Sequence, residues 1–114
     1  MTLPEEGSLL RIFIDEQARY QGKLLYEWLV LQAQQHGLAG ATVFRGIMGF
    51  GPDSRIQTAR ILRLSEDLPV VIEIIDTAEK LEDFLALVSP AIHAGLVTLE
   101  KAHVRIYRGS SGKK

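Results

Sequence analysis

The chain has 114 residues, of which 46% are hydrophobic and 24% are charged, and its formal net charge is −1. This length and composition predict one globular domain over residues 1–114, with a core of its own and flexible ends at 1–7 and 109–114. The absence of cysteine excludes disulfides, thiolate metal sites and cysteine nucleophiles. The nearly neutral charge gives no general attraction to nucleic acid, so we expect no nucleic-acid partner.

The N-terminal sequence and the hydropathy pattern bear on location. The run MTLPEEGS is acidic and lacks the basic start and apolar core of a signal peptide. No apolar run reaches membrane-spanning length. We therefore expect a soluble, cytoplasmic protein.

Three elements are expected in the first half of the chain. Residues 9–14 (LLRIFI) are rich in β-forming side chains and predict a first strand. Residues 22–36 predict a helix with a broad apolar face, and Gly37 is placed to end it. Residues 41–47 (ATVFRGI) predict a second strand. The expected apolar helix face comprises Leu24, Leu25, Trp28, Leu29, Leu31 and Ala33.

A strand and a helix follow in the second half. Residues 67–75 (DLPVVIEII) predict a third strand. Asp76 followed by Glu79 fits a capping box, so Asp76 is the expected N-cap of a second helix. Apolar residues recur at helical spacing from there to Val88.

Residues 96–108 (LVTLEKAHVRIYR) predict the last strand, with a break near Glu100 as an alternative. The order of elements is therefore β-α-β-β-α-β. Two split β-α-β halves of this kind form the ferredoxin-like plait. In this α+β fold, both helices cover one face of a four-stranded antiparallel sheet.

The predicted strands do not alternate cleanly between apolar and polar residues, as a sheet with one solvated face would. In the third strand, Val70, Ile72 and Ile74 share one face. Val71 and Ile75 lie on the other face. Apolar residues on both faces imply that something covers the open side, and the simplest cover is another copy of the chain. We therefore expect a closed homo-oligomer whose sheets face inward.

The segment between the second and third strands, residues 45–63, combines four arginines with three glycines and a single acid, Asp53. Gly46, Gly49 and Gly51 free the backbone for close approach, and arginine forks match carboxylate or phosphate oxygens. The segment therefore predicts a mobile loop that meets a small anionic ligand. A long hairpin loop with solvated charges is the alternative.

Two further features belong with this loop. Phe50 lies among the glycines and either stacks on a flat ligand or packs into a neighbouring subunit. Residues 101–114 form a second basic segment that contains no acid. Two basic segments in a slightly acidic chain indicate local handling of anions.

Patterns typical of catalysis and metal binding are not found. The glycines match neither a dinucleotide fingerprint nor a P-loop, and there is no GxSxG elbow. His36, His93 and His103 are not spaced to share a metal on one helix face. An RNA-recognition domain would share the strand order, but the third strand lacks stacking aromatics. We expect neither enzyme activity nor a metal; a hydrolase that uses His93 is a minor alternative.

The runs RGIMGFG, SRIQTARILRLSEDLPVVIEIID and GLVTLEKAHVRIYR closely resemble the DUF190 family, which belongs with the PII-like signalling proteins. The resemblance covers roughly residues 8–108 and implies a ferredoxin-like homotrimer. The loop at residues 48–63 would correspond to the T-loop of PII proteins. In PII relatives, adenine nucleotides or similar small effectors bind between subunits and change that loop's shape, which alters binding to a membrane transporter or an enzyme.

The resemblance also suggests which residues meet the effector. Gly46 to Gly51 match the base of the T-loop, and Arg105 and Arg108 resemble the basic C-terminal segment that helps to grip phosphate. The turn HAGLVTLE departs from PII proteins because it lacks their lysine-bearing phosphate loop. The predicted effector-binding residues are Arg45, Gly46, Gly49, Phe50, Gly51, Arg55, Arg60, Arg105 and Arg108.

Together these observations predict a non-enzymatic, trimeric PII-like regulator that binds a small anionic effector. An adenine nucleotide is the first candidate for this effector. The rival hypothesis is a structural or ion-tolerance trimer resembling CutA, in which the loop serves assembly and no effector exists.

Overall fold

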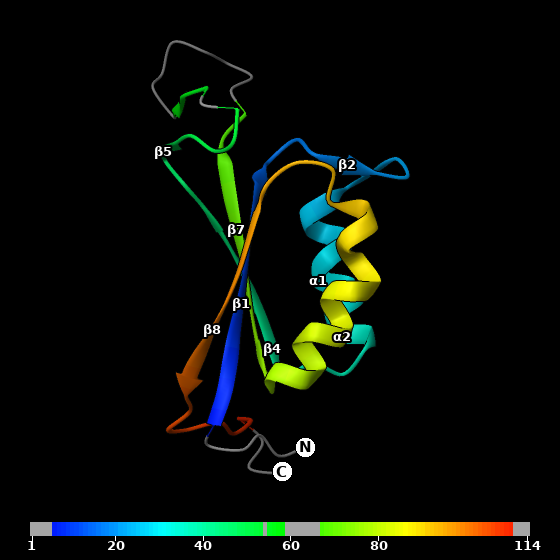
Figure 1. Cartoon of the computed structure of the whole chain (residues 1–114), viewed down its shortest axis with the longest axis vertical. Helices are drawn as coiled ribbons and strands as arrows, with labels where there is room; N and C mark the ends of the chain where they lie inside the picture. Colours follow the sequence, from blue (N-terminus) through cyan, green and yellow to red (C-terminus); the bar gives the residue numbers. More distant parts are fainter. Residues whose placement is uncertain (1–5, 54, 59–66, 111–114) are drawn as a thin grey trace.

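The structure is a computed structural model that describes residues 6–53, 55–58 and 67–110. Four long strands form one antiparallel sheet, and two helices cover one of its faces (Figure 1). The strands are β1 (Glu6–Asp15), β4 (Gly40–Arg45), β7 (Pro69–Asp76) and β8 (Leu96–His103), in the spatial order β4-β7-β1-β8. The helices are α1 (Leu25–Gln35) and α2 (Ala78–Val88). The predicted ferredoxin-like α+β fold is confirmed.

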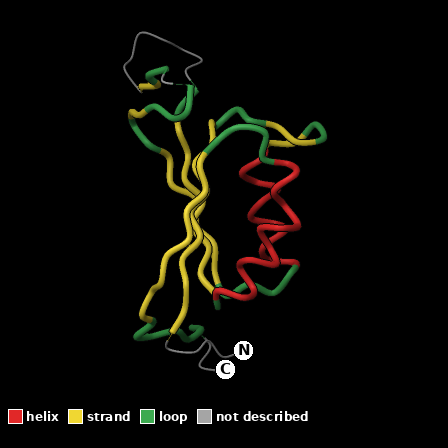
Figure 2. The backbone as a smooth tube through the Cα atoms, viewed as in Figure 1, coloured by secondary structure: helices red, strands yellow, loops and turns green. Residues whose placement is uncertain are grey.

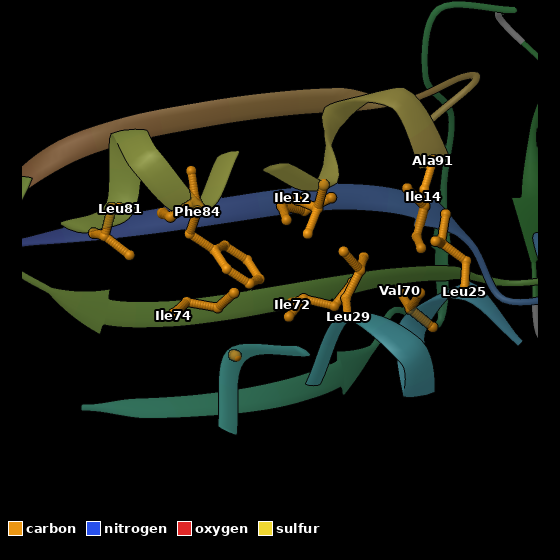
Figure 3. Close-up of a cluster of buried hydrophobic side chains, with 13 residues drawn as sticks. Ile12, Ile14, Leu25, Leu29, Val70, Ile72, Ile74, Leu81, Phe84 and Ala91 are labelled. Atoms are coloured by element: carbon orange, nitrogen blue, oxygen red, sulfur yellow. The ribbon is translucent and has the colours of Figure 1, made fainter. Parts of the chain in front are cut away.

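The core lies between the sheet and the helices, as Figure 3 shows. The β7 residues expected on one face are those that it buries, since Val70, Ile72 and Ile74 are at most 2% exposed. From β1, the buried residues alternate in the same way. Burying each large aliphatic side chain contributes roughly 1.5–3 kcal/mol. The remaining members of the core are Leu10, Ile12, Ile14, Leu25, Leu29, Ala33, Leu81, Phe84, Val88 and Ala91.

Helix α1 is shorter than predicted because a hairpin takes up the residues before it. Strands β2 (Arg19–Tyr20) and β3 (Lys23–Leu24) pair across a two-residue turn, in which Gln21 and Gly22 have φ values of 50° and 79°. Positive φ at both central residues is the geometry of a type I′ hairpin turn. Figure 2 shows this hairpin near the top of the helices.

Two other expectations about α1 can be compared with the structure. The broad apolar face is narrower than expected, because Leu31 is 50% exposed and the buried residues are Leu25, Leu29 and Ala33. The C-terminal end is as predicted: His36 is the C-cap, and Gly37 follows with a φ of 71°.

The sequence predicted Asp76 as the N-cap of α2, but the N-cap in the structure is Thr77. The Thr77 side chain accepts a hydrogen bond from the Lys80 N–H at 3.3 Å. Asp76 is buried, and its side chain accepts from the Ala39 N–H at 2.9 Å and the Thr77 N–H at 2.6 Å. Asp76 therefore joins the start of β4 to the end of β7, and this long-range role displaces it from the cap.

The last strand also ends earlier than predicted. Strand β8 pairs with β1 without a break at Glu100, which lies opposite Leu9, and it stops at His103. The chain then leaves the sheet, and the Tyr107 hydroxyl donates a hydrogen bond to the Ala39 carbonyl at 2.8 Å. At the other terminus, β1 begins at Glu6, inside the segment expected to be flexible.

The remaining short elements are a 3-10 turn at Ser89–Ala91 and two strands inside the loop, β5 (Met48–Gly49) and β6 (Gln57–Thr58). The second long strand stops at Arg45, two residues earlier than expected. Within the described ranges, no helix has both the length and the apolar character to cross a lipid bilayer.

Candidate functional site

The sheet face opposite the helices, called here the open face, is divided into rows of different chemistry. Nearest the loop, an apolar row crosses all four strands: Phe44 lies opposite Val71, Val71 opposite Phe13, and Phe13 opposite Leu96. Phe44 and Leu96, at the two edges, are each 51% exposed. A band of this kind, left uncovered in one protomer, is typical of a surface that another molecule covers.

The next row of the open face is charged. The Arg11 guanidinium on β1 lies between two carboxylates and donates to Glu73 on β7 and to Glu100 on β8, both at 2.9 Å. Its pKa is raised, chiefly by the hydrogen bond to Glu73, with Glu100 adding to the effect. These three side chains are 32%, 30% and 54% exposed. Arg11 and Glu73 lie opposite each other in this row, whereas Glu100 belongs to the row beyond it, opposite Leu9. Leu9 also lies opposite Ile75, so the charged row separates two apolar parts of the open face.

A pocket of about 550 Å³ lies at the loop end of the open face. Its floor is apolar, with Phe13, Val71 and Leu96 from three neighbouring strands. The loop forms the opposite wall, from Met48 to Asp53. Its charged lining residues, within the described part of the chain, are Asp15, Asp53 and Arg55. The pocket therefore has an apolar base with a small number of polar groups, as small-molecule sites do.

Close backbone contacts hold the walls of the pocket. The Gly46 N–H donates to the Pro69 carbonyl at 2.7 Å, and a Cβ on Gly46 would lie 3.0 Å from the Pro69 ring. On the other side, Gly95 has a φ of 149°, and a Cβ there would lie 2.4 Å from the Phe13 carbonyl oxygen. Position 95 therefore requires glycine, whereas at position 46 the Pro69 ring would have to shift by a few tenths of an ångström. At Gly51, by contrast, nothing lies within 4 Å of an added Cβ.

Gln57 attaches the returning limb of the loop to the sheet. Its side chain is 9% exposed, and its Nε2 donates to the Asp15 Oδ1 and to the Asp67 carbonyl, both at 2.9 Å. The Gln57 backbone pairs with Gly49 across the β5–β6 ladder. One amide group thus joins the end of β1, the loop and the chain before β7.

Several acids gather at this attachment. The Asp67 carboxylate accepts from the Gln17 N–H at 2.9 Å. Its pKa is raised above the ordinary 3.8, mainly by desolvation. The hydrogen bond from Gln17 opposes the shift, Asp15 and Glu16 add to it, and Arg55 opposes it more weakly. Glu16 in turn forms an ion pair with Arg45. Acidic and basic side chains therefore lie close together at the base of the loop.

The structure brings together five of the nine predicted effector-binding residues. Those that line the pocket are Gly46, Gly49, Phe50, Gly51 and Arg55. Arg45 lies outside the lining, in its ion pair with Glu16. Arg60 lies outside the described residues. Arg105 and Arg108 belong to the segment that follows β8, and this segment lies at the opposite end of the sheet from the loop (Figure 1).

The sequence reasoning missed several lining residues, notably Phe13, Asp15, Gln57 and Val71. Phe13 and Val71 were detectable because they are apolar residues on the strand face that the helices do not cover. No sequence motif pointed to Asp15 or Gln57. In the described part of the chain, no three His, Asp or Glu side chains cluster as a metal site would.

The sequence model of the DUF190 family, described as "Uncharacterized ACR", matches residues 7–104. A UPF0166 protein of Aquifex aeolicus is 45% identical over 96 residues, which cover 84% of this chain and 90% of that protein. A UPF0166 protein of Methanocaldococcus jannaschii is 32% identical over 107 residues, covering 93% and 96% respectively.

Solved structures with the same fold are PII-like. CPII of Thiomonas intermedia K12, solved with ADP, AMP and bicarbonate, matches with a TM-score of 0.65 and 17% identity, over 87% of this chain and 88% of that one. A protein of Thermus thermophilus, described as PII-like, matches with a TM-score of 0.62 and 19% identity, over 87% and 89%. At these identities the likeness establishes the fold.

Proposed function

The chain belongs to the DUF190 family, and on that premise we propose that it is a PII-like regulator whose pocket takes a small anionic effector, an adenine nucleotide. In this proposal it acts without catalysis, in the cytoplasm, and the loop at residues 48–63 passes the bound state on to a partner, either a transporter or an enzyme. CPII, which shares the fold, was solved with ADP and AMP, and this supports the choice of ligand.

The observation that carries the proposal is that residues at the base of the loop also form part of the pocket wall. Gly46, Gly49 and Arg55 line the pocket. Gly49 is part of the β5–β6 ladder, and Gly46 and Arg55 each lie two residues before one of its strands. A ligand that contacts these residues in one loop conformation and not in another shifts the loop toward that conformation. The partner then reads the loop, as in other switches that order a segment.

We further propose that the protein assembles as a homotrimer with the open faces inward. The apolar row of Phe44, Val71, Phe13 and Leu96 supplies part of the contact. Because Phe13, Val71 and Leu96 are also the floor of the pocket, the pocket then lies between protomers. Trimerisation would also bring positive charge to the pocket. The described lining has one cation, Arg55, against two acids, so Arg105 and Arg108 of a neighbouring protomer are expected to meet the phosphates.

The test is calorimetric titration of the purified oligomer with ATP, ADP, AMP, cyclic dinucleotides and bicarbonate. We expect saturable binding of at least one adenine nucleotide, and weaker binding when Arg55→Ala removes the lining cation. A verified trimer that binds none of these compounds refutes the nucleotide effector and favours the CutA-like alternative, in which the loop serves assembly.

A further inference from the structure

Resting on the proposed nucleotide site, we propose that Asp15 is its specificity-determining residue. In this proposal the carboxylate accepts a hydrogen bond from an exocyclic amino group on a flat heterocycle, and so selects an amino-purine. The recognised feature is thus the base and not the phosphate.

The position of Asp15 supports this role. It lines the pocket and lies at the end of β1, two residues beyond Phe13 and therefore on the same face of that strand. Across the sheet, Asp15 is opposite Pro69 and Phe13 is opposite Val71. A carboxylate thus stands at the rim of an apolar floor that suits a flat ring.

The hydrogen bonding of Asp15 leaves one acceptor available. Its Oδ1 accepts from the Gln57 Nε2 at 2.9 Å, and this bond fixes the orientation of the carboxylate. Its Oδ2 accepts no hydrogen bond from any residue in the described ranges, and the side chain is exposed. An ionised carboxylate can only accept, so the remaining oxygen selects a donor.

The charges in the pocket also orient the ligand. Asp15 repels a phosphate, whereas Arg55 in the loop wall attracts one. The base of a nucleotide therefore faces Asp15 while its phosphate faces the cation. A site that hydrogen-bonds an N–H group discriminates against an analogue without it, because the acceptor, once covered by the ligand, is then left unpaired.

The experiment compares AMP with purine riboside 5′-monophosphate, which carries hydrogen in place of the 6-amino group. Both are titrated calorimetrically into the full-length oligomer. A hydrogen bond to a charged group corresponds to a preference for AMP of at least about tenfold. Equal affinities in the wild-type protein overturn the inference while leaving nucleotide binding intact. If neither compound binds and ADP and ATP also fail, the proposed function falls with it.

Two variants separate recognition from net charge. In Asp15→Asn, the asparagine carbonyl oxygen can still accept the hydrogen bond from Gln57, while the new NH2 group faces the ligand's amino group. Because two donors then face each other, the preference for AMP should be lost. Asp53→Asn removes the same charge from the pocket wall and should keep the preference. Retention of the preference in Asp15→Asn, or its equal loss in both variants, overturns the role of Asp15. Circular dichroism and oligomer size establish that both variants are folded.

Discussion

The two faces of the central sheet contrast in what their side chains do. On the helix-covered face, Ile72 and its neighbours are buried within one protomer. On the open face, the same strand presents Val71, Glu73 and Ile75 half-buried, so that a charged row lies between two apolar ones. The covered face forms the core of the chain, whereas the open face leaves large apolar side chains such as Phe44 and Leu96 half exposed.

The contrast shows how a small domain can combine a stable core with the proposed ligand site. The strands are strongly apolar on both faces, and the loop is joined to the open face through Gln57 and Gly46. Mutations on the covered face should therefore affect stability, and mutations on the open face should affect assembly, loop order and binding.

The largest effect is expected from adjacent residues of β7. Ile72→Ala removes a fully buried side chain and should destabilise the fold by about 3 kcal/mol, because it leaves a cavity. Val71→Ala, one residue earlier and on the open face, should change the intrinsic fold little and should weaken the oligomer. Urea unfolding at fixed protein concentration and analytical ultracentrifugation separate the two outcomes. Equal loss of stability with no change in assembly contradicts the division between the faces.

A smaller effect is expected at the glycines of the pocket. A Cβ at position 95 meets the Phe13 carbonyl oxygen at 2.4 Å, and the φ of 149° disfavours a side chain. Gly95→Ala should therefore destabilise the protein by about 2 kcal/mol. Gly51→Ala is the matched control, because nothing lies within 4 Å of its added Cβ. A neutral result for Gly95→Ala in thermal unfolding would show that this approach is not required.

Gln57→Leu should release the loop with a modest loss of stability, about 1 kcal/mol, since two hydrogen bonds disappear. The sharper readout is hydrogen exchange, which should accelerate in residues 46–53 and 55–58 and stay unchanged in β1. Ile56→Ala, at the neighbouring position where the side chain is 61% exposed, is the control. Unchanged exchange in the Gln57 variant would remove its role as the attachment of the loop.

The smallest effect concerns pH. The folded-state pKa of Asp67 lies above its ordinary value of 3.8, mainly through desolvation. The group therefore favours folding most below pH 3.8, and this contribution is lost as the pH rises through the raised pKa. Asp67→Asn keeps the acceptor for the Gln17 N–H and should be the more stable protein at about pH 7, with the difference shrinking toward about pH 3. Greater wild-type stability at neutral pH contradicts the predicted sign.

Much of the fold could be predicted because its signals are local or periodic. The apolar face of β7, the glycine after α1 and the order of elements were all readable from spacing. The Gln21–Gly22 hairpin left a weaker local signal, a glycine in a two-residue turn. Asp76 was misassigned because two adjacent residues can both cap a helix, and the choice depends on Ala39, which is distant in sequence.

The site was only half predictable for a similar reason. The glycines and Arg55 are concentrated in one segment, so composition alone drew attention to them. Asp15 and Gln57 meet only because the end of β1 and the returning limb of the loop lie together in space. An acid at a strand end and a glutamine in a loop are ordinary residues until the fold pairs them. The convergence of Arg105 and Arg108 on the pocket depends on a neighbouring protomer and stays a prediction.

Native mass spectrometry of the intact protein with AMP tests the central claim most directly, because it reports assembly and occupancy together. The account predicts a trimer that binds up to three nucleotides, with reduced occupancy in the Arg55→Ala variant. A monomer, or a trimer that stays free of nucleotide at saturating AMP, ADP and ATP, would contradict it.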